Sequence, residues 1–149
     1  MLLRMLPEQV SSQWETIWAS MECVMAEQAR TEKGKSNVLS AMLAGEMQCW
    51  LLKDDEDDEV LALASTCFFY DPSGRKSLFI YTLLGYKPVS IKLWTEAFET
   101  LSKWAGFRGC DSVMAHTQNA KIIRLVNHLG GKAEDTLVYL DVIDMEKEV

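Results

Sequence analysis

Three apolar segments in the middle of the chain, each as long as a β-strand, constrain the fold more than any other feature. They are Met47–Lys53, Val60–Tyr70 and residues 77–86. The second and third are separated by residues 71–74 (DPSG), a turn sequence in which proline fixes φ and glycine permits positive φ. Because short connections join antiparallel neighbours, the pattern predicts a three-stranded antiparallel meander.

Residues 54–59, which join the first two strands, are all acidic. A calcium-binding loop needs ligands at set spacings and a glycine at its turn, and this run has neither. We therefore expect a solvated hairpin loop here and not a cation site. The two histidines and four cysteines are too dispersed to form a zinc site by spacing, so no metal cofactor is expected.

The segment before the meander predicts one strand and two helices. Residues 1–6 form a candidate edge strand. A long helix is predicted because apolar residues recur every three or four positions; these are Val10, Trp14, Ile17, Trp18, Met21 and Met25. A charged loop at residues 30–35 is expected next, and a short helix then begins at Ser36 or Asn37 and ends at Gly45.

The segment after the meander alternates helices and strands. Ser90 is expected to cap a helix whose buried stripe contains Ile91, Trp94, Phe98, Leu101 and Ala105. Residues 112–117 predict a short strand, Asn119 caps a further helix, and residues 137–143 predict a last strand. The order β-α-α-β-β-β-α-β-α-β makes an α/β (α+β) fold and needs a single domain, residues 1–149.

Composition excludes several classes of protein. The chain has 149 residues, 48% of them hydrophobic, which is enough for a buried core. Its net charge of −7 argues against nucleic-acid and anionic-membrane partners, which favour an excess of Lys and Arg. No run approaches the roughly 20 apolar residues that span a bilayer, and residues 1–6 are too short for a signal peptide. Four scattered cysteines fit buried thiols in a reducing compartment, so a cytoplasmic location is expected.

The order of elements and one local stretch resemble the GNAT (GCN5-related N-acetyltransferase) superfamily. In residues 115–131, a strand end leads to Asn119, then to a helix with Leu125 and Leu129 on its apolar ridge, then to a glycine pair. As architecture, the resemblance covers nearly the whole chain. It implies a GNAT-like fold with a central, mixed, splayed sheet of about six to seven strands and about four flanking helices.

The resemblance also implies acetyl-CoA as the cofactor, lying in the splay between the strands at residues 77–86 and 112–117. Family members hold the pantetheine arm with strand backbone. They hold the pyrophosphate with a glycine-rich loop at a helix start, where N–H groups and the helix dipole favour anions. On this sequence the implied cofactor-binding residues are Leu83, Leu84, Gly85, Lys87, Ser90, Ile91, Lys92 and Asn119.

Two departures from the family pattern concern the chemistry. The loop contains Pro88, which lacks an N–H, and has no glycine pair. Where family members often carry a tyrosine acid, this chain has Val126, and the strand at residues 77–86 offers no carboxylate base. Transfer to an amine needs a base to accept the amine proton. His116 is the catalytic candidate, with Asp111 or a held water molecule as the alternatives.

Two functions follow from these residues. The first is an acyl-CoA-dependent N-acetyltransferase with a divergent cofactor loop and either a small-molecule or a protein amine as acceptor. The alternative is a catalytically inactive GNAT-like binding or structural module with a protein partner; small proteins of this kind are encoded by phages and prophages. An open turn at residues 86–92 favours the enzyme. A cleft filled by Tyr86, Val89 or Ile91, or an exposed Trp104, favours the inactive module.

Overall fold

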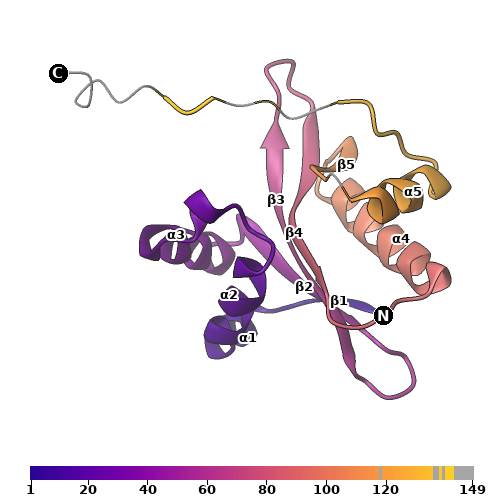
Figure 1. The fold of residues 1–149 in the computed structure, drawn as a ribbon, viewed down its shortest axis with the longest axis horizontal. Helices are drawn as coiled ribbons and strands as arrows, with labels where there is room; N and C mark the ends of the chain where they lie inside the picture. The colour runs from indigo at the N-terminus through magenta and orange to yellow at the C-terminus, as the bar shows by residue number, and fades with distance from the viewer. Residues whose placement is uncertain (118, 136–137, 139, 143–149) are drawn as a thin grey trace. The chain divides into compact units, whose positions relative to one another are not determined.

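The computed structural model describes residues 1–117, 119–135, 138 and 140–142. The chain divides into two compact units, Met1–Ala115 and His116–Val149. The first unit contains a five-stranded sheet with the strand order β1-β2-β3-β4-β5 (Figure 1). Its strands are β1 (Leu2–Arg4), β2 (Met47–Lys53), β3 (Val60–Tyr70), β4 (Lys76–Gly85) and β5 (Ser112–Ala115).

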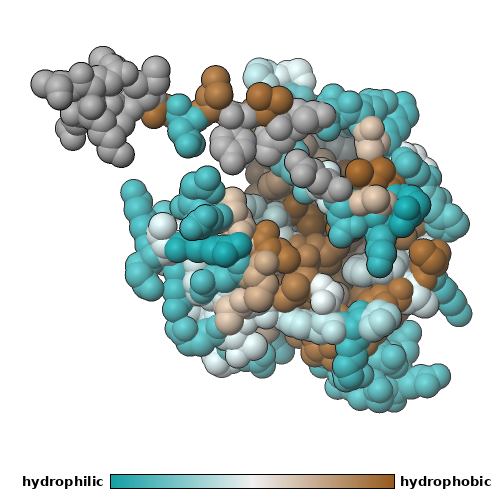
Figure 2. All heavy atoms as spheres, viewed as in Figure 1, coloured by the Kyte–Doolittle hydropathy of each residue, from teal (hydrophilic) through white to brown (hydrophobic). Residues whose placement is uncertain are grey.

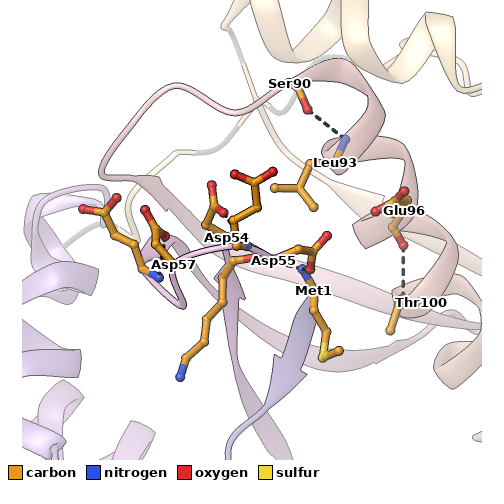
Figure 3. Close-up of polar contacts among 11 residues, drawn as sticks. Met1, Asp54, Asp55, Asp57, Ser90, Leu93, Glu96 and Thr100 are labelled. Atoms are coloured by element: carbon orange, nitrogen blue, oxygen red, sulfur yellow. Dashed lines mark hydrogen bonds and ion pairs between the residues drawn. The ribbon is translucent and has the colours of Figure 1, made fainter.

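Neighbouring strands from β1 to β4 pair antiparallel, and β4 pairs parallel with β5. The predicted meander and edge strand are thus confirmed, with β4 beginning and ending one residue earlier than expected. The acidic residues 54–59 form the loop between β2 and β3, where the N–H of Asp54 donates to the carbonyl of Glu59 at 2.8 Å. The N-terminal ammonium of Met1 pairs with Asp55 at 2.9 Å (Figure 3). In the described part of the chain, no group of three or more His, Cys, Asp or Glu side chains is arranged to hold a metal ion.

The helices between β1 and β2 are α1 (Pro7–Ser12), α2 (Trp14–Glu22), the short 3-10 helix η1 (Glu27–Ala29) and α3 (Glu32–Leu43). The prediction of one long helix is wrong, because the helix breaks at Gln13, with φ −115° and ψ 18°. The apolar stripe continues across this break, so its spacing carries no sign of it. The predicted charged loop is also wrong in part: Thr31 accepts a hydrogen bond from the N–H of Gly34, and α3 begins at Glu32.

One face of the sheet packs against α1, α2 and α3. This core includes Ile17, Met21, Cys49 and Leu63, all with exposures below 5%. Burial raises the pKa of the Cys49 thiol to about 12, so this cysteine stays protonated and serves as a small apolar side chain.

The opposite face is covered by α4 (Ile91–Phe107), which buries Ala97, Leu101 and Ala105. Leu101 and Ala105 pack on Leu78 of β4 and Trp50 of β2. The expected burial of Ile91 is wrong, since its side chain is 53% exposed. Leu93 packs on the sheet instead, and at 3.6 residues per turn Ile91 points about 200° away from it.

A chain of hydrogen bonds crosses the α4 side of the sheet. The indole Nε1 of Trp50 donates to Thr66 Oγ1 at 2.9 Å, and Thr66 Oγ1 donates to Gln48 Oε1 at 2.7 Å. The amide Nε2 of Gln48 donates to the carbonyl of Gly45 at 3.2 Å. The side chains of Thr66, Trp50 and Gln48 are all buried, so each bond satisfies a group that water does not reach.

Trp104 of α4 lies beside this chain. Its ring meets Trp50 edge to face, with centroids 5.2 Å apart, and stacks on Phe68 at 5.9 Å. Trp104 is therefore partly buried against β2 and β3 and does not form an isolated exposed patch.

The second unit contains α5 (Ala120–His128). Asn119 caps this helix as predicted, because its Oδ1 accepts from the N–H of Lys121 at 2.9 Å. The strand predicted at residues 137–143 falls partly outside the described residues, which omit 137, 139 and 143; the four that are described, Val138, Leu140, Asp141 and Val142, are not in a strand. The sheet accordingly has five strands among the described residues, fewer than expected. None of the helices described is both long and apolar enough to cross a membrane.

Candidate cofactor site

The pairing between β4 and β5 ends halfway along β4. Their parallel pairing runs from Ser77 opposite Ser112 to Ile80 opposite Ala115 and then stops. β4 continues to Gly85, still paired with β3 on its other side. In the part of the chain that the structure describes, no strand pairs with the outer edge of β4 at residues 81–85. Backbone groups of Leu83, Leu84 and Gly85 that point away from β3 are thus open to a ligand.

A β-bulge lies where the two strands separate. Thr82 is opposite Ser65 and Ile80 is opposite Thr66, so Tyr81 is the additional residue on β4. The bulge redirects the side chains that follow it: Ile80 packs in the core under α4, whereas the hydroxyl of Thr82 bonds to that of Ser65. Tyr81 is 37% exposed, and Figure 2 shows apolar side chains gathered over β3 and β4. Burial, with the neighbouring Cys67 thiol, raises the pKa of Tyr81, so its phenol remains protonated near neutral pH.

The turn after β4 is tied to β3 and α2. The backbone N–H groups of Tyr86 and Lys87 both donate to the carbonyl of Leu61, at 2.8 and 3.3 Å. The Tyr86 hydroxyl also lies 2.6 Å from the Ser20 hydroxyl on α2. Because Pro88 has no N–H, the first three residues of this turn offer no free backbone donor to a phosphate.

The side chain of Lys87 is engaged as well. Its Nζ forms an ion pair with the carboxylate of Glu59, at the end of the acidic loop. This hydrogen bond to Glu59, followed by the charges of Glu59 and Asp57, raises the pKa of Lys87. Lys87 is therefore positive at neutral pH, but its charge is largely balanced by its acidic neighbours.

The start of α4 is the part of the site with free donors. Ser90 Oγ accepts from the N–H of Leu93 at 3.1 Å and so caps the helix, as predicted (Figure 3). Within the described residues, the N–H groups at positions 89–92 have no hydrogen-bond partner. The first turn contains no acidic residue, and Lys92 is exposed and forms no ion pair among those resolved between described residues. A capped helix start with free N–H groups is a favourable position for an anion.

Comparison with known proteins identifies the fold. No protein-family profile matches the chain, and no curated sequence matches it. Solved structures do. The chain is similar to AAC(6')-Iy, solved with the bisubstrate analogue CoA-S-monomethyl-acetylneamine, with a TM-score of 0.71 and 10% identity over 97% of this chain and 98% of that one. The chain has the GNAT fold.

Two further structures extend this comparison. An aminoglycoside acetyltransferase from an uncultured soil metagenomic sample has a TM-score of 0.69 and 16% identity, over 96% of this chain and 98% of its own. A ribosomal-protein-alanine N-acetyltransferase from Brucella melitensis has a TM-score of 0.62 and 10% identity, over 96% and 99%. At these identities the likeness concerns the GNAT fold alone.

On the GNAT fold, most of the expected cofactor residues fall into two groups. Leu83, Leu84 and Gly85 lie on the open edge of β4, and Ser90, Ile91 and Lys92 lie at the start of α4. Both groups belong to the first unit, and a four-residue turn joins them. The side chain of Lys87, between the two groups in sequence, forms an ion pair with Glu59. His116 and Asn119 belong to the second unit. The roles of all these residues in catalysis or cofactor binding stay predictions.

The partners of the turn are the residues that sequence reasoning missed. Leu61 and Ser20 hold Tyr86 and Lys87 through contacts that are distant in sequence, and neither residue type signals such a role. The ion pair of Glu59 with Lys87 had one signal in the sequence, because an acidic hairpin loop is expected to attract a lysine.

Proposed function

We propose that the chain is an acyl-CoA-dependent N-acetyltransferase-like protein that binds acetyl-CoA at the parting of β4 and β5. The observation that carries the proposal is the continuity of two open features. The edge of β4 is unpaired beyond Ile80 among described residues, and four free N–H groups follow at the capped start of α4. Together they suit a ligand with an amide-containing arm and an anionic end.

The two groups of residues bind different parts of acetyl-CoA in this proposal. Backbone groups of Leu83 to Gly85 pair with the amides of the pantetheine arm, as a strand would. The N–H groups of Ser90, Ile91 and Lys92, with the Lys92 ammonium, bind the pyrophosphate. Acetyl-CoA supplies the acetyl group; the protein has to accept a proton from the attacking amine. We assign that role to His116, since β4 carries no carboxylate.

The acceptor in this proposal is an amine of a small molecule or of a protein. The similar structures include enzymes described for both classes, an aminoglycoside acetyltransferase and a ribosomal-protein-alanine N-acetyltransferase. The GNAT fold therefore accommodates either class of acceptor.

An inactive binding or structural module is the second candidate, and the turn at residues 86–88 favours it. Two N–H groups of that turn are bonded to Leu61, Pro88 has none, and Lys87 is neutralised by Glu59. In this alternative the chain has lost the N–H groups that bind phosphate and functions by binding a protein partner. A role in a phage or prophage belongs to this alternative. Loss of acetyl-CoA binding is the feature that separates it from the enzyme.

Isothermal titration of the full chain with acetyl-CoA, and separately with coenzyme A, tests the proposal. We expect micromolar binding that Lys92→Ala weakens about 3- to 10-fold, because it removes one charge-assisted contact to phosphate. Lys103→Ala is the matched control, since Lys103 is an exposed lysine near the other end of α4. No binding at millimolar ligand would reject the acetyltransferase and leave the inactive module.

The ion pair at Lys87 provides a second prediction. Glu59→Gln is expected to tighten acetyl-CoA binding about 2- to 5-fold, because it releases Lys87 and removes a negative charge near the phosphates. Glu99→Gln on the exposed face of α4 changes the net charge equally and forms no ion pair among those resolved, so it is expected to change little. Equal effects of the two variants in the same titration would mean that Lys87 has no special access to the ligand.

A further inference from the structure

A pocket of about 180 Å³ lies on the first unit, away from β4 and its turn. It is lined by residues of β1 and β2, of α1, of the end of α3, and by Arg108, which follows α4. Part of the wall is apolar: Met5, Val10 and Met42 line the pocket with exposures of 8%, 2% and 3%, beside a larger polar part. This volume suits a small molecule.

Two guanidinium groups stand at this pocket. Arg4 and Arg108 both line it, and their Cζ atoms lie 5.4 and 5.2 Å from the centroid of the Trp104 ring. The ring orients both cations by cation–π attraction. Neither arginine pairs with a carboxylate among the described residues. In a chain with a net charge of −7, these two guanidinium groups give the pocket two cationic hydrogen-bond donors.

Gln48 contributes a third donor at the pocket, and its orientation is settled by its neighbours. Its Oε1 accepts from Thr66, which places Nε2 on the side of Gly45, and one N–H of Nε2 donates to the Gly45 carbonyl. The second N–H of this amide has no partner in the described part of the chain, although Gln48 is only 5% exposed. The polar side chains that line the pocket are therefore all hydrogen-bond donors.

The end of α3 also borders the pocket. Its last carbonyls accept from the N–H groups that follow, Gly45 to Met42 at 3.3 Å and Glu46 to Ala41 at 2.9 Å. This closure satisfies the carbonyls of Ala41 and Met42. The pocket thus combines an apolar wall with a polar side made of two cations and an amide N–H.

From this combination we infer that the pocket binds a small organic anion, a carboxylate attached to a compact apolar group. The carboxylate accepts hydrogen bonds from Arg4, Arg108 and the free N–H of Gln48, and the apolar group contacts Met5, Val10 and Met42. A neutral compound of the same shape lacks the charge that the arginines require. An inorganic anion lacks the group that the apolar wall would bury.

Titration of the full chain with benzoate tests this inference, with benzamide as the neutral isostere and sulfate as the anion without an apolar group. We expect benzoate to bind and the other two to bind at least ~10-fold more weakly. Arg4→Gln and Arg108→Gln are each expected to raise the benzoate Kd about 10-fold or more. Each is expected to lower the free energy of unfolding by no more than about 1 kcal/mol, because the exposed side chain loses only its cation–π contacts. Saturating acetyl-CoA is expected to leave the benzoate Kd unchanged, which separates this pocket from the cofactor site.

Arg75→Gln is the matched control, since Arg75 is an exposed arginine in the turn before β4 and does not line the pocket. Benzoate affinity equal to that for benzamide or sulfate would overturn the inference. So would wild-type affinity in both Arg4→Gln and Arg108→Gln, or an equal loss in Arg75→Gln, because each result would place the anion elsewhere or show non-specific binding.

Discussion

Leu78→Ala is expected to lower the free energy of unfolding by about 3–4 kcal/mol. Leu78 lies near the start of β4, has no exposed surface, and packs with Leu101, Ala105 and Trp50 between the sheet and α4. The substitution removes buried apolar surface and leaves a cavity that partners on a helix and two strands close only in part. Total stabilities of ~5–15 kcal/mol make this a large fraction of the whole.

Urea unfolding followed by tryptophan fluorescence measures this effect in the first unit, because all five tryptophans lie there. Leu43→Ala is the control, an identical exchange at a site that is 44% exposed in the last turn of α3. It is expected to change stability by no more than about 0.5 kcal/mol. Similar losses for the two variants would contradict the packing of α4 on β4.

Thr66→Val is expected to destabilise the same unit by about 2–4 kcal/mol, although valine has nearly the same shape as threonine. The Thr66 hydroxyl accepts from Trp50 and donates to Gln48, and the three side chains are buried. Removing it leaves one buried donor and one buried acceptor without partners, and each such group costs about 1–3 kcal/mol.

The control for this exchange is Thr100→Val. The Thr100 hydroxyl is exposed and donates only to the Glu96 carbonyl one turn earlier in α4 (Figure 3). Water replaces that bond, so the unfolding midpoint in urea is expected to stay near that of the wild type. A midpoint unchanged by Thr66→Val would show that water reaches Trp50 and Gln48.

Local signals predicted much of this fold. The strands Met47–Lys53 and Val60–Tyr70 have the bounds expected from their apolar runs and flanking turns. The caps at Ser90 and Asn119 were also expected, because each depends on a side chain that reaches only two or three residues ahead.

The wrong predictions concern helix boundaries and helix faces, which the spacing of apolar residues does not define. The stripe from Val10 to Met25 stays buried through the break at Gln13. Thr31 lies among charged residues that resemble a loop, although Thr is a common N-cap and an acidic residue such as Glu32 is favourable in the first turn. Ile91 was placed on the buried stripe of α4, whose direction is set by packing on β2 and β3.

For the candidate site, the resemblance predicts the segment at residues 83–92, and its binding of a cofactor stays a prediction. The open edge at Leu83 to Gly85 and the helix start at Ser90 are where the resemblance placed them. The bonds from Tyr86 and Lys87 to Leu61, and the pairing of Lys87 with Glu59, join residues more than 20 positions apart. Contacts of this kind depend on the register of β3 and β4, which one sequence does not encode in any local pattern.

The early end of the β4–β5 pairing also bears on how the protein behaves in concentrated solution. An unpaired strand edge is a template on which other chains add strands. Leu83 and Leu84 follow one another on this edge, without the lysine or proline that often protects such edges. Where β4 separates from β5, the same backbone groups can bond either to a ligand or to a strand of a neighbouring molecule. A ligand bound at this edge would therefore also protect the chain from self-association.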